Sequence, residues 1–335
     1  METMKQFLDK YRNLIDQELD QIVSGKPPIL YNAARWLLLA GGKRIRPALA
    51  LTLAHMILGQ EGEKNVLPYA LAVELIHNFT LIHDDIIDED EYRRGVPTVH
   101  VKYGRNMAIL AGDLLFSLSF EKPLSETMKN RTDPARAVRA MHIIARATRI
   151  LAEGQTLDIS FEKTWDVNLQ EYLKMIYMKT GALIEAALGA AAVITGLQEK
   201  HIENAMLYGR NVGVAFQIRD DILGTFGDPA KTGKPVYNDL RKAKKTVLVI
   251  YAINNLEGEE RNELIEILES KTDDLQKLKK AAELIRSSGA LEYAEKLAEH
   301  YVQEAVEAIK KIPAQKEEAR KALVEFAWFT VKRDK

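Results

Sequence analysis

An acidic stretch within residues 75–90 carries the side chains best suited to bind a divalent cation. Asp84 and Asp88 are four residues apart, so on a helix they lie on the same face. His77 precedes Asp84 by seven residues, which places each Asp within roughly 20° of its stripe. Two carboxylates on one face repel each other unless a cation lies between them. The spacing predicts a site for Mg²⁺, which takes one or two carboxylates together with phosphate oxygens and water.

A second acidic pair, Asp220 and Asp221, follows an apolar helical segment far along the chain. Gln217 lies three residues before Asp220 and four before Asp221, so the three side chains can share one polar edge. An isolated acidic motif of this kind is equally typical of a solvated helix end. Because both Asp-Asp pairs end apolar helical runs, we expect them to form two walls of one site.

Basic residues that could bind a phosphate group are also present. Lys43, Arg44 and Arg46 stand in a glycine-led turn that enters a helix, where backbone N–H groups and the helix dipole favour an anion. Each basic cluster alone is typical of a solvated surface, whereas a Mg²⁺-bridged diphosphate explains the clusters and the Asp pairs together. The further basic residues are Arg93, Arg94, Lys179, Lys231, Lys234, Arg241, Lys242, Lys244 and Lys245.

The composition indicates a soluble globular protein. The chain has 335 residues, with 47 Lys and Arg against 48 Asp and Glu. A net charge of −1 argues against binding nucleic acid through bulk electrostatics, and the absence of cysteine excludes disulfides and thiolate chemistry. The longest stretches without charged residues, 47–60 and 186–198, are about two-thirds of the length that spans a bilayer. No signal peptide is recognisable, so we expect a cytoplasmic protein without a transmembrane segment.

The elements that position these residues are predicted to be helices throughout. Proline is absent between Pro134 and Pro229 and between Pro235 and Pro313, which leaves long stretches for uninterrupted helices. Apolar residues recur there at helical spacing, and no linker or repeat divides the chain. We therefore predict one all-α domain over residues 1–335. Its motif-bearing core covers about 40–246, and an outer helical layer covers about 256–335.

Taken in order, these motifs resemble those of trans-isoprenyl diphosphate synthases, the polyprenyl synthetase family, and among them the archaeal-type geranylgeranyl diphosphate synthases. The resemblance runs from about residue 40 to 246. The matching segments are 41–47 (GGKRIRP), His77, 84–88 (DDIID), 93–100 (RRGVPTVH), 111–113 (AGD), Gly154-Gln155, Lys179-Thr180, 216–221 (FQIRDD), 232–235 (TGKP), Asp239 and 244–246 (KKT).

The resemblance implies a helical fold around a deep central cavity, a homodimer, and head-to-tail (1′–4) condensation of isopentenyl diphosphate with allylic diphosphates. The allylic substrates of the family are dimethylallyl, geranyl and farnesyl diphosphate. It also implies Mg²⁺ as cofactor, three ions per active site, bridged by diphosphate. Ionisation of the allylic carbon–oxygen bond needs charge stabilisation by Mg²⁺ and cations and no side-chain nucleophile.

The roles of single residues follow from the same resemblance. The isopentenyl diphosphate site maps onto Lys43, Arg46, His77 and Arg94. The metal ligands map onto Asp84, Asp88 and Asp220, with Asp85 and Asp221 in support. The allylic diphosphate contacts map onto Arg93, Lys179, Thr180, Gln217, Lys234 and Lys244. The residues expected to carry catalysis are Asp84, Asp85, Asp88, Lys179, Gln217, Asp220 and Asp221, while Gln155 and Asp158 line the cavity wall.

Two departures from the family pattern stand out. Many relatives close the second acidic motif with a third Asp, where this sequence has Gly224. Ala243 replaces a common glycine before Lys244. Because Asp220 is the expected direct ligand, we predict weaker support around the metal rather than lost activity.

Product length depends on the residues just before the first acidic motif, Phe79 and Thr80, which are expected to form the floor of the elongation cavity. This combination, without an insertion in the motif, resembles synthases of C20 products, with C15 and C25 or longer products as alternatives. Helical projection places Thr80 about 40° and Phe79 about 140° from Asp84. Phe79 could therefore act through a neighbouring helix or subunit, or belong to the core, and Ser117, Ser119 and Phe120 could also set the floor.

Other functions were weighed against this one. A class I terpene cyclase or head-to-head synthase would share the acidic helix but would not need the basic cluster of the homoallylic site. A metal phosphohydrolase could be read from His55 and His83-Asp84, but it leaves the basic loops unexplained. A non-catalytic partner subunit would be expected to lose acidic residues that are intact here. Nucleic-acid binding is disfavoured because the basic residues are dispersed without interleaved aromatics.

Overall fold

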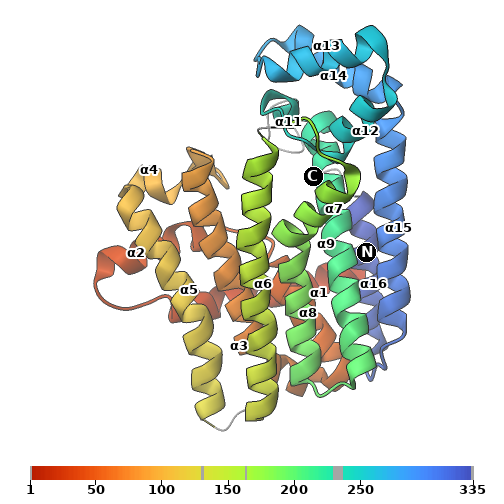
Figure 1. Cartoon of the computed structure of the whole chain (residues 1–335). Helices are drawn as coiled ribbons and strands as arrows, with labels where there is room; N and C mark the ends of the chain where they lie inside the picture. The colour runs from red at the N-terminus through yellow and green to blue at the C-terminus, as the bar shows by residue number, and fades with distance from the viewer. Residues whose placement is uncertain (1, 130–131, 163, 229–236, 333–335) are drawn as a thin grey trace. The chain divides into compact units, whose positions relative to one another are not determined.

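The computed structural model describes residues 2–129, 132–162, 164–228 and 237–332. Most of these residues lie in helices, with one two-residue hairpin among them, which confirms the all-α prediction (Figure 1). The elements are α1 (Glu2–Ile22), α2 (Pro28–Leu39), α3 (Ile45–Ile87), β1 (Tyr92–Arg93), β2 (Val96–Pro97), α4 (Val99–Tyr103), α5 (Arg105–Met128), α6 (Pro134–Phe161), α7 (Leu169–Ile176), η1 (Tyr177–Gly181), α8 (Ala182–Ile194), α9 (Glu199–Phe226), α11 (Asn238–Arg241), α12 (Val247–Asn255), α13 (Gly258–Glu269), α14 (Leu275–Ser287), α15 (Ala290–Lys310) and α16 (Glu317–Lys332).

The chain forms two compact units that interleave along the sequence. Each unit consists of three separate stretches of the sequence. The first acidic motif belongs to unit 1 and the second to unit 2. Unit 1 comprises Met1–Thr148, Glu185–Met206 and Ile309–Glu325, and unit 2 comprises Arg149–Ile184, Leu207–Ala308 and Phe326–Lys335. The organisation of residues 1–335 as one domain with an outer layer stays a prediction.

Unit 1 is built around α3, which lies side by side with α5 (Figure 1). The amphipathic helix α1 adds Tyr11, Ile15 and Leu19 to this core, all fully buried at four-residue spacing. A kink interrupts α3 at Gly59, whose φ of 61° is left-handed. The Met56 carbonyl next to the kink accepts hydrogen bonds from the amides of Gln315 and Lys316, at 2.8 and 3.1 Å, so no buried acceptor is left unsatisfied there.

Unit 2 packs α7, the second half of α9, α12 and α14 around one apolar cluster. Helix α12 begins at Val247 after Thr246, whose hydroxyl accepts from the Val249 amide at 3.4 Å. Asn168 and Glu171 form a reciprocal capping box at the start of α7. These caps fix the helix starts beside the second acidic motif.

In the described part of the chain, two apolar windows are long enough to cross a membrane, one in Ile45–Ile87 and one in Leu169–Ile194. They are 61% and 83% buried inside the protein, as expected for core helices of a soluble protein. The sequence argument from charge-free stretches had not singled out windows of this length, because α3 tolerates a few charged residues within its apolar run.

Candidate functional site

The first acidic motif lies at the C-terminal end of α3. Asp85 is buried, and Arg93 donates its Nε to Asp85 Oδ1. Burial raises the pKa of Asp85 to about 6, although Arg93 opposes this rise. The second oxygen, Oδ2, is buried and has no hydrogen-bond partner in the part of the chain described. Asp84 is half-buried and Asp88 is exposed, so the two predicted metal ligands are the accessible members of the motif.

A short hairpin returns two adjacent arginines to this helix end. Arg93 lies in β1 and Arg94 follows with a left-handed φ of 54°, which turns the two side chains in different directions. Arg93 binds Asp85, whereas Arg94 donates to the Leu37 carbonyl at 3.1 Å and to Asn78 Oδ1 at 3.3 Å. Arg94 therefore lies toward α2 and the middle of α3.

The basic turn before α3 contains one arginine that binds carboxylates of the protein, Arg44, and one that is available to a ligand, Arg46. Arg44 is 2% exposed and its guanidinium binds Glu74 Oε1 at 2.8 Å and Asp16 Oδ1 at 2.7 Å. Burial would lower the pKa of Arg44, but Glu74 and Asp16 outweigh it and raise the pKa. Arg46 has a buried Nε without a hydrogen-bond partner among the described residues. Burial lowers its pKa, partly offset by Glu74.

Positive charge in this cluster exceeds the carboxylates that balance it. Arg46 and Arg94 form no ion pair with a carboxylate within the described ranges. Burial lowers the pKa of Arg94 to about 10. Burial, followed by Arg46 and Arg94, holds the pKa of His77 well below its ordinary value. A neutral imidazole beside two unpaired arginines is an arrangement that an anionic ligand would complete.

Glycine is required where the chain approaches these arginines. A Cβ on Gly42 would lie 3.1 Å from an Arg44 nitrogen and 3.2 Å from an Arg94 nitrogen, and its φ of 151° also disfavours a side chain. Lys43, which follows, is exposed. The Gly41-Gly42 pair thus lets the turn pass close to the cluster while it presents Lys43 outward.

The second acidic motif lies on α9 in unit 2. Asp221 is buried, and its two oxygens accept from neutral donors, Tyr172 Oη and Gln217 Nε2, the latter at 3.0 Å. Burial, with the nearby charge of Asp239, raises the pKa of Asp221 to about 7. Gln217 also accepts from the Thr180 hydroxyl at 2.9 Å, so one hydrogen-bonded chain links Thr180 to the acidic pair. Asp220 is half-buried.

Lys179 and Thr180 stand in a π-helical turn, η1, between α7 and α8. Such turns displace side chains from their α-helical directions and occur often at functional sites. Lys179 Nζ binds Asp158 Oδ2 on α6 at 2.5 Å, whereas Thr180 binds Gln217 on α9. The turn therefore directs two neighbouring residues to two different helices.

Glycines allow both of these helices to approach the π-helical turn. A Cβ on Gly213 would lie 2.5 Å from Gly181 Cα, and a Cβ on Gly154 would lie 2.8 Å from the Lys179 amide nitrogen. Both obstacles are backbone atoms, which cannot move aside as a flexible side chain could. The glycines of α6 and α9 thus set the distance at which Asp158 and Gln217 meet the turn.

The predicted floor residues contact their neighbours differently. Phe79 packs its ring against His83 and against Phe116 on α5, with centroids 4.9 and 5.3 Å apart, and Phe116 continues to Phe120 at 5.0 Å. Thr80 donates its hydroxyl to the His77 carbonyl at 2.8 Å. A Cβ on Gly112 would lie 2.6 Å from His83 Cδ2, so α5 lies against this aromatic group only because it carries glycine there.

The structure brings the predicted residues together as two separate groups. Lys43, Arg46, His77 and the first motif belong to unit 1, and Lys179, Thr180, Gln217 and the second motif belong to unit 2. Lys244 is exposed, and its amide donates to the Asp239 carbonyl at 3.0 Å. Lys234 lies outside the described residues. That the two groups line one site stays a prediction.

Two supporting residues were missed from the sequence. Glu74 is a buried acid within an apolar helical run, and that position was a usable indication of a paired cation. Tyr172 carried no such indication, because its contact with Asp221 joins distant parts of the sequence.

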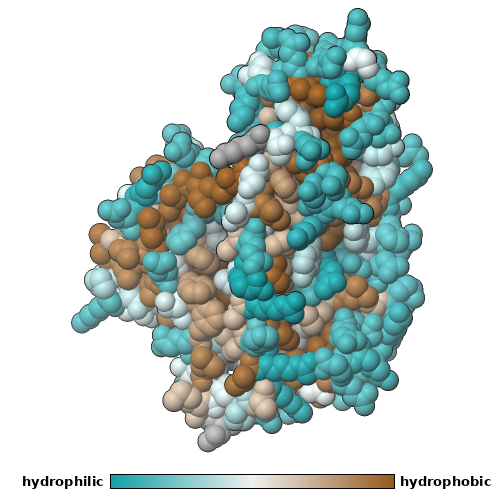
Figure 2. All heavy atoms as spheres, viewed as in Figure 1, coloured by the Kyte–Doolittle hydropathy of each residue, from teal (hydrophilic) through white to brown (hydrophobic). Residues whose placement is uncertain are grey.

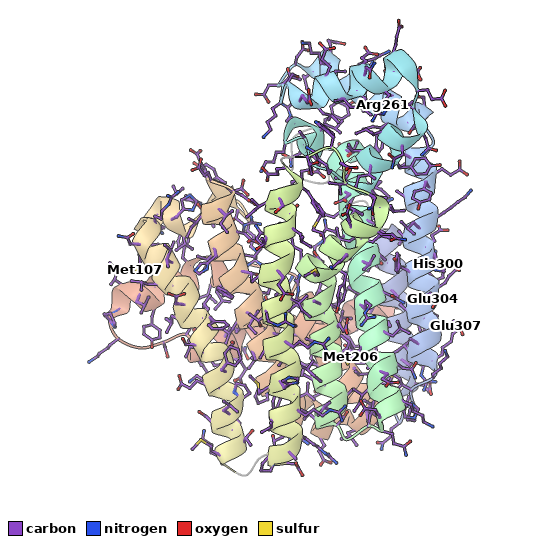
Figure 3. The ribbon with its side chains drawn as sticks, viewed as in Figure 1. Met107, Met206, Arg261, His300, Glu304 and Glu307 are labelled. Carbon is purple, nitrogen blue, oxygen red and sulfur yellow. The ribbon has the colours of Figure 1, made fainter. Side chains whose placement is uncertain are left out.

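Neither group forms a complete metal cage by itself. No three His, Asp or Glu side chains are arranged to hold a metal ion within the described ranges. His300, Glu304 and Glu307 lie exposed along α15 and do not form such a group either (Figure 3). The accessible carboxylates of Asp84, Asp88 and Asp220 suit Mg²⁺ when a ligand supplies further oxygens. The residues present therefore fit a cation that arrives together with a phosphate group.

Comparison with known proteins connects these features to one family. The sequence model of the family described as Polyprenyl synthetase matches residues 27–285. A geranylfarnesyl diphosphate synthase of Aeropyrum pernix is 46% identical over 311 residues, which cover 92% of this chain and 96% of the relative. The crystal structure of a geranylgeranyl pyrophosphate synthetase from Pyrococcus horikoshii superimposes with a TM-score of 0.90 at 40% identity, covering 99% and 98% of the two chains.

A third similar protein was solved with ligands. The geranylgeranyl pyrophosphate synthase of Corynebacterium glutamicum, complexed with isoprenyl diphosphate and magnesium, has a TM-score of 0.85 at 27% identity, and the match covers 97% of this chain and 99% of that one.

Proposed function

This chain belongs to the polyprenyl synthetase family and is a trans-prenyltransferase, and from that premise we propose that it condenses isopentenyl diphosphate head to tail with allylic diphosphates. The observation that carries the proposal is the pair of arginines, Arg46 and Arg94, which have no carboxylate partner among the residues that the structure describes and accompany a complete acidic motif. A site for one Mg²⁺-bound diphosphate would need the acidic motif alone. The extra cations supply a place for a second, metal-free diphosphate.

The isopentenyl diphosphate is held by Arg46, Arg94, Lys43 and His77 in this proposal. Arg46 and Arg94 can each donate two parallel hydrogen bonds to phosphate oxygens. His77, kept neutral by burial and by its cationic neighbours, donates one N–H without adding charge. Arg44 takes no part in binding, because Glu74 and Asp16 already occupy its guanidinium.

The allylic diphosphate is held by a second set of residues in this proposal. Arg93, Lys179, Thr180, Gln217, Lys234 and Lys244 contact its oxygens, while Asp84, Asp88 and Asp220 hold three Mg²⁺ ions. Bound Mg²⁺ supplies the positive charge that stabilises the departing diphosphate. Asp85 and Asp221 are buried and hydrogen-bonded, so they fix the direction of their accessible neighbours rather than bind the ion.

The product is geranylgeranyl diphosphate, a C20 chain, with C25 as the second candidate. Phe79, Phe116 and Phe120 form a continuous aromatic group across α3 and α5, which supports a closed floor and a chain of limited length. The similarity to a geranylfarnesyl diphosphate synthase favours the longer alternative. Thr80, bound to the His77 carbonyl, adds little bulk beside Phe79.

A homodimer in the cytoplasm completes the proposal. Apolar side chains gather over α4 and α5 on the face shown in Figure 2. Ile109, Phe116 and Leu124 are exposed and recur at spacings of seven and eight residues, which places them along one side of α5. A contiguous apolar stripe of this kind is typical of a protein interface. Replacement of Leu110, which is 52% exposed, by Lys should shift the mass measured by light scattering from dimer to monomer.

A product assay tests the reaction. Purified protein receives labelled isopentenyl diphosphate, Mg²⁺ and one of the C5, C10 and C15 allylic diphosphates, and products are separated after dephosphorylation. We expect one dominant C20 product that disappears with EDTA and in Asp84→Ala. Arg105→Gln, which removes an exposed cation near the same motif, is the matched control and should retain activity. Folded protein that incorporates no label with any primer would refute the proposal.

The floor is tested by the same assay. Phe79→Ala should lengthen the product by at least one C5 unit, and Phe120→Ala should do so less, since Phe120 contacts Phe79 through Phe116. An unchanged product in Phe79→Ala would assign Phe79 to the core.

A further inference from the structure

Asn78 is a fully buried amide in the apolar run of α3 that leads to the first acidic motif. It lies four residues after Glu74, and residues four apart lie on the same face of a helix. A buried amide is costly unless its donors and its acceptor find partners. The partners of Asn78 therefore decide whether it serves the core alone or the site beside it.

The side chain of Asn78 joins a carboxylate to an arginine. Its Nδ2 donates to the Glu74 carbonyl at 2.8 Å and to Glu74 Oε1 at 3.1 Å, and its Oδ1 accepts from Arg94 Nη1 at 3.3 Å. A guanidinium has only donors and a carboxylate only acceptors, so one orientation of the amide satisfies both neighbours. An ionised aspartate would have no donor for Glu74, and a leucine would have no acceptor for Arg94.

Glu74 is itself fixed by Arg44. The Arg44 guanidinium binds Glu74 Oε1 at 2.8 Å and Asp16 Oδ1 at 2.7 Å, and the Glu74 side chain is only 2% exposed. A row of polar contacts therefore runs from Asp16 through Arg44, Glu74 and Asn78 to Arg94. The buried ion pair near one end of this row sets the position of the arginine at the other end.

Within the part of the chain that the structure describes, Arg94 donates only to neutral acceptors. They are the Leu37 carbonyl at 3.1 Å and Asn78 Oδ1 at 3.3 Å. Burial lowers the pKa of Arg94, and Glu74 opposes this through space. Two neutral acceptors fix the direction of a guanidinium but leave its charge without a bound counter-ion. An anion that enters the cluster then meets an arginine that is already oriented and still uncompensated.

We propose that Asn78 is a positioning residue for the isopentenyl diphosphate site: it orients the Arg94 guanidinium and, as a neutral amide between Glu74 and Arg94, keeps Arg94 from pairing with a carboxylate of the protein. The inference rests on the proposed function, because the anion that Arg94 binds there is the diphosphate of that substrate. Asn78 acts through Arg94. Position 78 therefore sets the affinity for one substrate and leaves the other unchanged.

A purely structural role makes a different prediction. If Asn78 only filled the core and satisfied Glu74, its replacement would lower the melting temperature and change the kinetics with both substrates alike. A residue that positions Arg94 affects isopentenyl diphosphate selectively. Asn78→Asp keeps the shape of the side chain and adds a charge that can pair with Arg94, so it tests the need for a neutral acceptor. Asn78→Leu keeps a similar size and removes the acceptor.

The experiment compares wild type with Asn78→Asp, Asn78→Leu and the matched control Asn255→Asp. Asn255 is exposed on α12 and donates its Nδ2 to the Tyr251 carbonyl at 2.8 Å, which is the same contact four residues back that Asn78 makes with Glu74. Three quantities are measured: the melting temperature, the Kd for isopentenyl diphosphate in Mg²⁺-free buffer by isothermal titration calorimetry, and the KM for each of the two substrates.

We expect Asn78→Asp to raise the Kd for isopentenyl diphosphate roughly 10- to 100-fold, since the diphosphate must displace a carboxylate from Arg94. Asn78→Leu should raise this Kd about three- to tenfold, because Arg94 loses one of its two acceptors but keeps its charge. The KM for isopentenyl diphosphate should follow the Kd, and the KM for the allylic diphosphate should stay within about twofold of wild type. The control should match wild type in all three quantities.

A Kd in Asn78→Asp no higher than in Asn78→Leu would overturn the inference, as would an equal rise of the two KM values. Wild type that does not bind isopentenyl diphosphate would instead refute the proposed site itself, so the two failures are distinguishable. If Asn78→Asp does not fold, Asn78→Leu decides. Its Kd must then exceed that of wild type, and an unchanged Kd would refute the positioning role.

Discussion

Asp85 on α3 and Asp221 on α9 are both the buried second member of an Asp-Asp pair, yet different groups hold their carboxylates. Asp85 accepts from the charged guanidinium of Arg93 and keeps one oxygen without a partner. Asp221 accepts from two neutral donors, Tyr172 and Gln217, which satisfy both oxygens. The pKa is raised to about 6 in the first case and to about 7 in the second. Burial is the largest cause of both rises; Arg93 opposes it at Asp85, whereas at Asp221 the charge of Asp239 adds to it and the two neutral donors oppose it.

The difference extends to the surroundings of each motif. In unit 1 the buried pair of Arg44 and Glu74 repeats the same use of opposite charges. In unit 2 a further carboxylate, Asp239, adds to the raised pKa of Asp221. The two motifs thus differ in the sign of the charge that acts on their buried carboxylate.

The largest expected effect is on the ion pair that anchors the unit 1 cations. Glu74→Gln leaves the Arg44 guanidinium buried with only Asp16 as counter-charge, so we expect the free energy of unfolding to fall by about 3 to 5 kcal/mol. Urea denaturation followed by circular dichroism measures this. Glu292→Gln, which breaks an exposed pair with Lys296, should change it very little. A loss similar to the control would show that the charges of unit 1 are not balanced in this way.

The second largest effect is expected for Arg93, the cation that binds the first acidic motif. Arg93→Gln leaves Asp85 buried without its charged partner and also removes a proposed contact with the allylic diphosphate. We therefore expect kcat/KM for the allylic substrate to fall roughly 100-fold, which corresponds to about 2.7 kcal/mol. Steady-state kinetics with Arg105→Gln as control tests this. A fall below tenfold would mean that Asp85 does not need a cation, and the contrast with Asp221 would be lost.

A smaller effect is expected at the second motif. Tyr172→Phe removes one neutral donor while Gln217 remains, so kcat/KM should fall about tenfold, since a hydrogen bond of this kind is worth about 1.4 kcal/mol. Tyr69→Phe, whose hydroxyl contacts Thr127 at 3.3 Å in unit 1, is the control and should keep wild-type kinetics. If Tyr172→Phe proved as harmful as Arg93→Gln, neutral and charged donors would be equivalent here.

The smallest effect concerns His77 and depends on pH. Burial and the neighbouring arginines hold its pKa well below the usual value in the folded state. Below about pH 6.5 the unfolded chain binds a proton that the folded chain does not, so stability is lost as the pH falls. The free energy of unfolding of wild type minus that of His77→Gln should therefore decrease from pH 7.5 to pH 5.5. A difference that stays constant would mean that His77 is not held neutral.

The sequence predicted the parts of the site that depend on local spacing and left out those that depend on distant contacts. The position of Asp84 and Asp88 at one helical end follows from neighbouring residues and was confirmed as a structural feature. Separate roles for Arg44 and Arg46 became visible only with Glu74 and Asp16 in place. The close approach of Asp239 on α11 to Gly224 on α9 could not be predicted either, because no periodicity connects these two elements.

The kink of α3 at Gly59 has a consequence for how the protein is made. The Met56 carbonyl there is satisfied by the amides of residues 315 and 316, and unit 1 includes the stretch Ile309–Glu325. A unit that usually folds as soon as it leaves the ribosome cannot finish here until nearly the whole chain has been synthesised. A chain that ended before residue 309 would thus leave unit 1 without its last stretch, although 1–148 had been made first, and expose it to aggregation or proteolysis.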